Sequence, residues 1–171
     1  MHPGYCPNWE YANYPNRVQV LQQEAQKILL SLRNGNLDII KNVTDTREIH
    51  SKLFYRLTPP GYNYYAGRYR GEDENCLKHM QVGIPGTDVG YHPLVVLDSM
   101  DILKSSMMTG FSQLDRVFDS DKEENEKLLY LVKFACDIFV QFLKIHPYVN
   151  GNGHIGRFIV IAILGKYGYW M

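Results

Sequence analysis

The sequence has no excess of charge of either sign, because its 18 lysines and arginines balance its 18 aspartates and glutamates. A protein that binds nucleic acid or an anionic membrane through its overall field needs a surplus of positive charge. We therefore expect neither nucleic acid nor a membrane as a partner. Any affinity for phosphate must come from a local group of residues.

Cysteine is scarce. Cys6, Cys76 and Cys136 are odd in number and far apart, without the close spacing that metal sites and disulfide frameworks use. We expect reduced thiols, which favours a cytoplasmic protein, either in the cell that makes it or delivered to the cytosol of another cell. The first residues, 1–5, lack the basic and apolar segments of a signal peptide.

Long hydrophobic runs are also missing, since the longest, Phe158 to Leu164, is too short to span a bilayer. We expect a soluble protein. The chain has 171 residues, of which 45% are hydrophobic, and this is enough for one domain with a core but not comfortably for two.

Helical periodicity covers most of what is present. Apolar residues at spacings of three and four predict helices over residues 17–33, from 44 to about 57, and from 95 to about 111. Residues 1–16 show no periodicity and indicate an irregular arm. Residues 62–93 are rich in glycine and tyrosine, with short apolar stretches, and favour extended chain or a hairpin.

A further helix is predicted after residue 120, where Ser120 and Glu123 have the spacing of a capping box. Its apolar residues, between Leu128 and Leu143, cover a wide face, so we expect this helix at the centre of the core. It must end at Pro147, and an apolar run resumes from Ile155. The fold class is mostly α with a small β element.

The segment between these two helices carries the chemistry. Gly151 and Gly153 flank Asn152 and allow backbone N–H groups to turn inward at the start of a helix, which predicts a phosphate-binding loop. Arg157, one turn later, can reach an outer phosphate, and His146 can accept a proton near neutral pH. An Asn-Gly turn between apolar runs is equally typical of a β-hairpin, and glycines also end helices.

This segment resembles the signature of the Fic family of nucleotidyl transferases. The residues that match in register are His146, Pro147, Tyr148, Gly151, Asn152, Gly153 and Arg157. Segments 67–70 and 91–93 look like those that flank the β-hairpin flap of this family, so the resemblance covers roughly residues 44–170. It implies a Fic-type helical domain over 44–171, preceded over 1–43 by an arm and an accessory helix.

The resemblance also implies a reaction. His146 would be the general base that deprotonates a serine, threonine or tyrosine hydroxyl of a target protein as it attacks the α-phosphate of ATP, with Mg²⁺ accompanying the nucleotide. Gly151, Asn152 and Gly153 would hold the phosphates and Arg157 an outer one. Tyr148 would pack under the loop. The product would be an AMP-modified target protein and pyrophosphate.

Two positions depart from the signature, and both concern charge. Asn150 stands where the family has an acid that holds Mg²⁺, and an amide oxygen is a weaker ligand for a hard cation. His154 replaces a phosphate-binding arginine. Slow transfer is one reading. A regulatory protein that binds nucleotide without turnover is another, and use of a different phosphate donor or removal of AMP is a third.

The sequence also offers candidates for target binding and for restraint of the activity. Met80, Gln81 and Val82 are candidates for a flap edge to which a target strand adds, although a hairpin that only covers the core is an equal alternative. Residues 120–125 fit the inhibitory string of the family, but the capping box explains them better. No C-terminal inhibitory helix is expected, so restraint would come from an upstream helix or a separate inhibitory partner. His50, His79 and His92 are expected to have ordinary packing or surface roles.

Overall fold

The computed structural model describes residues 6–83 and 90–170, and the described residues are helical and contain no strand. The α-helices are α1 (Arg17–Arg33), α2 (Ile39–Thr44), α3 (Arg47–Phe54), α4 (Pro93–Phe118), α5 (Glu124–Ile145) and α6 (Asn152–Lys166). Short 3-10 turns are η1 (Tyr11–Asn13), η2 (Tyr55–Leu57) and η3 (Asn63–Tyr65).

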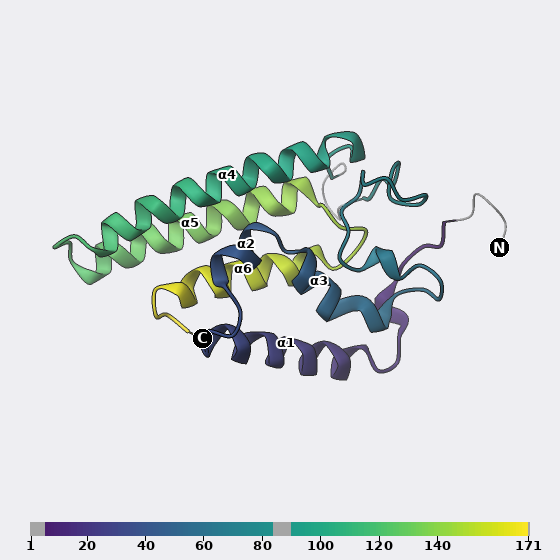
Figure 1. The fold of residues 1–171 in the computed structure, drawn as a ribbon, viewed down its shortest axis with the longest axis horizontal. Helices are drawn as coiled ribbons and strands as arrows, with labels where there is room; N and C mark the ends of the chain where they lie inside the picture. The colour runs from purple at the N-terminus through teal and green to yellow at the C-terminus, as the bar shows by residue number, and fades with distance from the viewer. Residues whose placement is uncertain (1–5, 84–89, 171) are drawn as a thin grey trace.

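The helices are stacked around α6 (Figure 1). The antiparallel pair α4 and α5 lies on one side of it, α1 lies on the other, and α2 and α3 lie alongside. Residues of α6 with no exposed surface include Ile155, Ile159 and Ile163. By contrast, α5 leaves Leu129 and Val132 exposed, so α6, and not the predicted helix after residue 120, is the most enclosed element.

The helix predicted over 17–33 is confirmed at both ends. The stretch from residue 44 is shorter than predicted, since it comprises α3 and η2, and α2 before it was not predicted. Asp38 caps α2 by accepting a hydrogen bond from the Lys41 N–H at 2.8 Å. Because α2 has only six residues, it offers too little periodicity to be recognised. The domain boundary predicted after residue 43 falls within this helix.

The predicted capping box is wrong. The N-cap of α5 is Glu123, and no side chain caps it. The Ser120 hydroxyl instead donates at 2.7 Å to the Val117 carbonyl oxygen, which belongs to the last turn of α4. The same residues that fit a helix start therefore complete the end of the preceding helix.

The predicted β-hairpin is not found among the described residues. Residues 62–83 form η3 and a series of turns. One bond of hairpin type is present, from the Gly90 N–H to the Val82 carbonyl oxygen at 3.2 Å. The tip that would join them, residues 84–89, lies outside the described residues.

The prediction that the cysteines stay apart is also wrong. Cys6 and Cys76 form a disulfide, with Cα atoms 5.5 Å apart and 70 positions of sequence between them. Only Cys136, which is exposed, has a free thiol. The pair could not be recognised from spacing because the fold, and not the local sequence, brings the two residues together. Disulfides persist mainly in oxidising compartments, so the cytoplasmic location stays a prediction.

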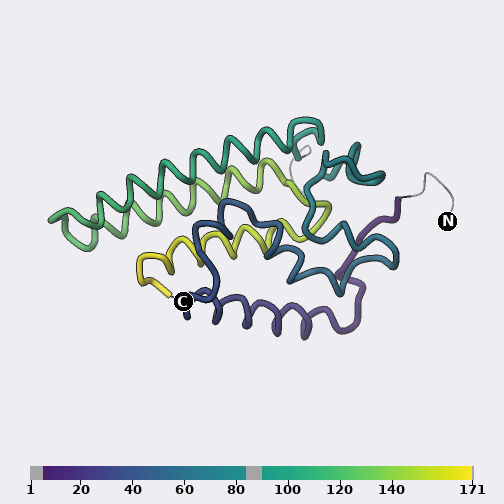
Figure 2. Tube along the Cα trace, viewed as in Figure 1, coloured from purple at the N-terminus to yellow at the C-terminus, as the bar shows by residue number. Residues whose placement is uncertain are grey.

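The disulfide fixes an N-terminal arm, which we define as residues 6–14. The arm runs beside the turns that follow α3 before it reaches α1 (Figure 2). Trp9, with 1% of its surface exposed, donates its indole N–H to the Leu57 carbonyl oxygen at 2.6 Å. The Tyr14 hydroxyl donates to the Thr58 carbonyl oxygen at 3.0 Å. The arm is therefore packed into the fold.

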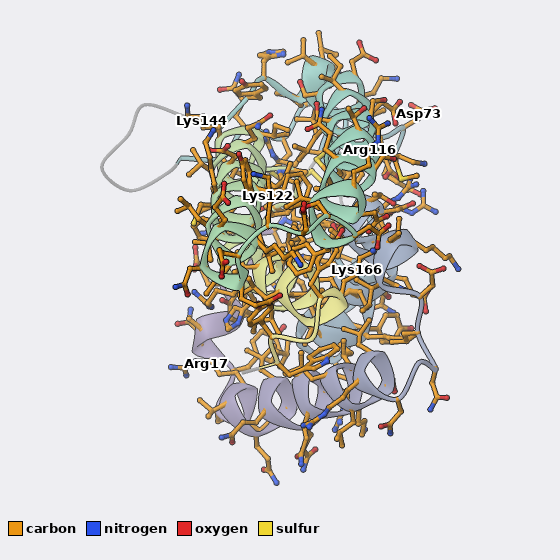
Figure 3. All side chains as sticks on the ribbon, turned by 90° about the vertical axis from the view of Figure 1, so that its left-hand side faces the viewer. Arg17, Asp73, Arg116, Lys122, Lys144 and Lys166 are labelled. Atoms are coloured by element: carbon orange, nitrogen blue, oxygen red, sulfur yellow. A yellow bond between two sulfur atoms is a disulfide. The ribbon has the colours of Figure 1, made fainter. Side chains whose placement is uncertain are left out.

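Apart from Arg70, which is fully buried, the charged side chains of the described residues lie at or near the surface (Figure 3). The labelled residues Arg17, Arg116, Lys122, Lys144 and Lys166 are spread over different helices and the turn between α4 and α5 (Figure 3). None of the described helices is both long enough and apolar enough to cross a membrane.

Candidate active site

His146 is placed by the way α5 ends. It is the C-cap residue, with φ 52° and ψ 59°, and it is the one non-glycine residue with positive φ in the described part of the chain. A left-handed residue ends a helix by turning its carbonyl and side chain away from the helix axis. Holding a histidine there costs about 1 kcal/mol, so neighbouring bonds must fix it.

Arg70 supplies those bonds. Its side chain is fully buried, and its Nε and Nη2 donate to the His146 carbonyl oxygen at 2.9 and 2.7 Å. Nη2 also approaches the Ile145 carbonyl at 3.1 Å. Nη1 donates to the Met80 carbonyl oxygen and Nη2 also lies close to the Tyr91 carbonyl oxygen, both at 3.0 Å. One guanidinium therefore joins the end of α5 to both stems of the expected flap.

The electrostatics of His146 suit a base. Burial lowers the pKa of its half-buried imidazole, and the positive charge of Arg70 lowers it further. The ring is therefore neutral at pH 7 and has a free lone pair that can accept a proton.

The loop after His146 is closed by Asn152, whose side chain is nearly fully buried. Its Oδ1 accepts from the Tyr148 N–H at 2.9 Å, and its Nδ2 donates to the Tyr148 carbonyl oxygen at 2.8 Å. Tyr148 is buried beneath the loop, and its hydroxyl lies 2.8 Å from the Thr46 hydroxyl. The Asn152 side chain thus shapes the loop, which leaves only its backbone to face a ligand.

Gly151 and Gly153 have different roles. Gly151 has φ 81°, and a Cβ there would lie 2.6 Å from the Phe54 ring, so both backbone and space require glycine. A Cβ on Gly153 would meet only Arg157 Nη1, at 3.8 Å. The N–H groups of Asn152 and Gly153 find no acceptor in the described part of the chain. They are open donors at the N-terminus of α6, where an anion is favoured.

Arg157 lies close to this N-terminus. It is exposed and forms no ion pair or hydrogen bond with the described residues, so its charge is available. His154 is half-buried, with its ring centroid 6.0 Å from that of Tyr11. Burial lowers the pKa of His154, and Arg157 lowers it further. His154 is therefore neutral at pH 7 and does not supply the charge of the arginine that it replaces.

Asn150 is held at three points. Its Nδ2 donates to the Trp9 carbonyl oxygen at 2.8 Å, and its Oδ1 accepts from the Gly151 N–H at 2.7 Å. Its own carbonyl lies 2.9 Å from His50 Nε2. The amide oxygen that was predicted to bind Mg²⁺ is therefore engaged with the loop. Among the described residues, no group of three or more histidine, cysteine, aspartate or glutamate side chains could hold a metal ion.

His50 packs against the loop and also holds it through hydrogen bonds, which the sequence did not indicate. Its Nδ1 accepts from the Gly67 N–H at 2.9 Å, so the proton sits on Nε2, which donates to the Asn150 carbonyl. Its ring stacks on Tyr148 with centroids 3.7 Å apart. The packing role that we expected is present, and the position of His50 one helical turn before Phe54 was the available signal.

The predicted target edge has mixed surroundings. Met80 and Val82 are half-buried and Gln81 is exposed. The Met80 carbonyl is taken by Arg70, and the Val82 carbonyl accepts from Gly90. These bonds leave the role of the edge untested, and it stays a prediction.

The inhibitory string at residues 120–125 lies at the wrong end of α5. The 22 residues of that helix separate Glu124 from His146, and at about 1.5 Å per residue they span roughly 33 Å. Glu124 pairs instead with Lys127 and Tyr169. Restraint by a separate partner stays a prediction.

Comparison with known proteins supports the sequence resemblance. The Fic/DOC family model matches residues 36–164, which contain α5, the loop and most of α6. No curated protein and no solved structure gave a match. The match spans most of the chain, and it includes the histidine, the glycine loop and the arginine described above. The chain therefore belongs to the Fic/DOC family.

Proposed function

We propose that this protein is an adenylyltransferase that moves AMP from ATP to a hydroxyl group of a target protein. Its family is linked in general to the transfer of AMP or nucleotides to proteins. The observation that carries the proposal is the N-terminus of α6. Open N–H groups of Asn152 and Gly153, an unpaired Arg157 and a neutral His146 belong to one loop and its two flanking helices.

The proposed reaction uses these residues in sequence. The phosphates of ATP bind the open N–H groups, and Arg157 neutralises an outer phosphate. The target hydroxyl oxygen attacks the α-phosphorus as its proton passes to the unprotonated ring nitrogen of His146. The bond from the α-phosphorus to the bridging oxygen breaks, and pyrophosphate leaves. Catalysis then depends mainly on orientation and charge neutralisation.

Mg²⁺ stays a predicted companion of ATP. Because the Asn150 oxygen accepts from Gly151 and no carboxylate joins it, the described residues assign the ion no ligand. When bound to the phosphates of ATP, the ion would neutralise their charge.

A direct test is incubation with ATP labelled at the α-phosphate, together with calorimetric titration of ATP with and without Mg²⁺. We expect label on the protein or on added target proteins, and loss of at least about 100-fold in His146→Ala. The variant should still bind ATP. Failure of the folded protein to bind ATP at millimolar concentration would remove the basis of the proposal.

The second candidate is a nucleotide-binding regulatory protein with little turnover. The neutral His154 and the hydrogen-bonded Asn150 favour this candidate. At both positions the signature of the family has a charged residue, and this chain does not. His154→Arg discriminates between the two. A large gain in transfer would indicate an enzyme weakened by the substitution, and tighter binding without transfer would indicate a regulator.

The nucleotide base is not assigned by the described contacts. A titration panel of ATP, GTP, CTP and UTP therefore belongs to the same experiment. The protein could be found to transfer label from another donor, or to release AMP from a modified protein. Either result would keep the proposed phosphate binding by the loop and replace ATP as the proposed substrate.

A further inference from the structure

We propose that the N-terminal arm, residues 6–14, is a positioning element of the nucleotide site. Through its main chain at Trp9 it holds Asn150, and Asn150 in turn fixes the Gly151 N–H. The Cys6–Cys76 disulfide keeps the arm in this place. This inference rests on the proposed function, because it assigns the arm a role in nucleotide binding.

The contact between arm and loop is direct. The Trp9 carbonyl oxygen accepts from Asn150 Nδ2 at 2.8 Å across 141 positions of sequence, and Asn150 Oδ1 accepts from the Gly151 N–H at 2.7 Å. The amide of Asn150 thus relays the position of the arm to the first glycine of the loop. The arm reaches α6 as well, through the edge contact of Tyr11 with His154.

The arm lies outside the part of the chain that matches the family, which begins at residue 36. Its contact is made to the position where this chain departs from the signature. An aspartate could not donate a hydrogen bond to the Trp9 carbonyl, and its charge would repel that oxygen. Asparagine is therefore the residue that this arm requires.

The arm is anchored at several points. Trp9 is enclosed by the aromatic rings of His50, Phe54 and Tyr65, with centroids 5.9 to 6.0 Å away. The Tyr65 hydroxyl donates to the Pro7 carbonyl oxygen at 3.1 Å. The disulfide is the single covalent anchor within the described residues. Without it, only non-covalent contacts oppose the release of the arm.

This arrangement makes nucleotide binding dependent on redox state. A dithiol reductant converts the disulfide to two thiols and is itself oxidised to a disulfide, so electrons and protons balance. Cys6 is only partly buried, which gives the reductant access. After reduction, the arm exchanges between bound and released positions, so Asn150 no longer holds Gly151 in place beside the open N–H groups of Asn152 and Gly153.

The test compares ATP affinity of the full chain in oxidised form, after reduction with dithiothreitol, and in Cys6→Ser. We expect the last two to bind about 3- to 10-fold more weakly, as for the loss of one or two hydrogen bonds. Cys136→Ser is the matched control, because its thiol is free and exposed, and it should bind as wild type does. Equal affinity in oxidised and reduced wild type would overturn the inference.

Non-additivity separates positioning from general stability. Asn150→Asp removes the hydrogen bond from residue 150 to the Trp9 carbonyl oxygen. Reduction of the disulfide should therefore weaken ATP binding by less than about 2-fold in this variant. Full additivity of the two changes would show that the arm does not act through Asn150. If Cys6→Ser fails to fold, the ATP affinity of folded wild-type protein is compared before and after addition of dithiothreitol.

Hydrogen exchange without nucleotide keeps this test independent of the proposed function. Peptides that cover residues 148–154 should exchange faster after reduction, whereas peptides from the far end of α5 should not change. If exchange becomes faster after reduction but the protein does not bind ATP, the contact between arm and loop is supported and the proposed adenylyltransferase function is refuted. Unchanged exchange together with normal, redox-insensitive ATP binding would refute the arm alone.

Discussion

At the scale of single residues, the two glycines that flank Asn152 give a matched pair of tests. Gly151→Ala places a Cβ against the Phe54 ring and requires a left-handed alanine. We expect it to lower the free energy of unfolding by about 2 to 4 kcal/mol. Gly153→Ala meets open space and should change it by less than about 0.5 kcal/mol. Urea denaturation measures both, and equal losses would contradict the assignment.

His50 links stability to pH. Burial lowers its pKa from 6.5 to about 3 in the folded protein, so below pH 6.5 the unfolded chain binds a proton that the folded chain does not. Stability is therefore full above pH 6.5 and falls as pH decreases toward 3. The contribution is about 1.4 kcal/mol per pH unit.

His50→Gln should remove this dependence, because glutamine keeps a donor and an acceptor but does not titrate. Between pH 6.5 and 5 we expect wild type to lose about 2 kcal/mol more than the variant does. Denaturation with urea at the two pH values provides the measurement. Parallel losses in the two proteins would show that another group carries the pH dependence.

The protonation of His146 should determine how kcat/KM of the proposed reaction falls at acid pH. Because burial and Arg70 lower its pKa, the ring stays unprotonated as pH falls through 6.5. The rate constant kcat/KM should therefore hold at pH 6.5 and decline only at lower pH, as the base becomes protonated. A limb at or above pH 6.5 would mean that His146 is less buried or is not the base.

At the scale of elements, Arg70 joins α5 to the two stems around residues 84–89. Arg70→Lys offers three donors from one point in place of a planar group that serves four carbonyls. We expect a loss of about 3 kcal/mol in stability, with faster hydrogen exchange at Met80 and Tyr91. Arg68→Lys, an exposed neighbour in ion pairs with Glu72 and Glu74, is the control and should have little effect.

Elements with a long apolar period could be predicted, and those without it could not. The 17 residues of α1 were bounded correctly because Asn34 and Gly35 follow a regular stripe. The six residues of α2 carry too few turns for such a stripe. Ser120 satisfied the pattern of a helix start but bonds backwards to Val117. A short sequence motif such as this one does not show whether the serine bonds to the helix that follows or to the helix that precedes it.

The candidate site divides in the same way. The segment from His146 to Arg157 is contiguous in sequence, so its site residues could be predicted. Arg70, His50 and Trp9 contact the site from 76 to 141 positions away, through hydrogen bonds in which a main-chain carbonyl is the acceptor. Such bonds leave no spacing pattern, because any residue with a carbonyl can accept them.

At the scale of the whole molecule, the Cys6–Cys76 disulfide closes a long segment of chain, with 70 positions between its ends. A loop of this length is expected to stabilise the fold by about 4 kcal/mol through the entropy of the unfolded chain. Thermal unfolding before and after reduction should show a clear decrease in Tm, with no such change in Cys136→Ser. A Tm insensitive to reductant would mean that the two thiols are not bonded in solution.

The aromatic pocket around Trp9 has a bearing on how the protein can be shortened. A fragment cut to residues 36–164 would lack the indole that His50, Phe54 and Tyr65 surround, and it would lack α1, which covers α3. Its interior would open to water on that side, and such fragments tend to aggregate. We therefore expect that a shortened version needs residues 6–35, in addition to the part that matches the family model, to stay folded.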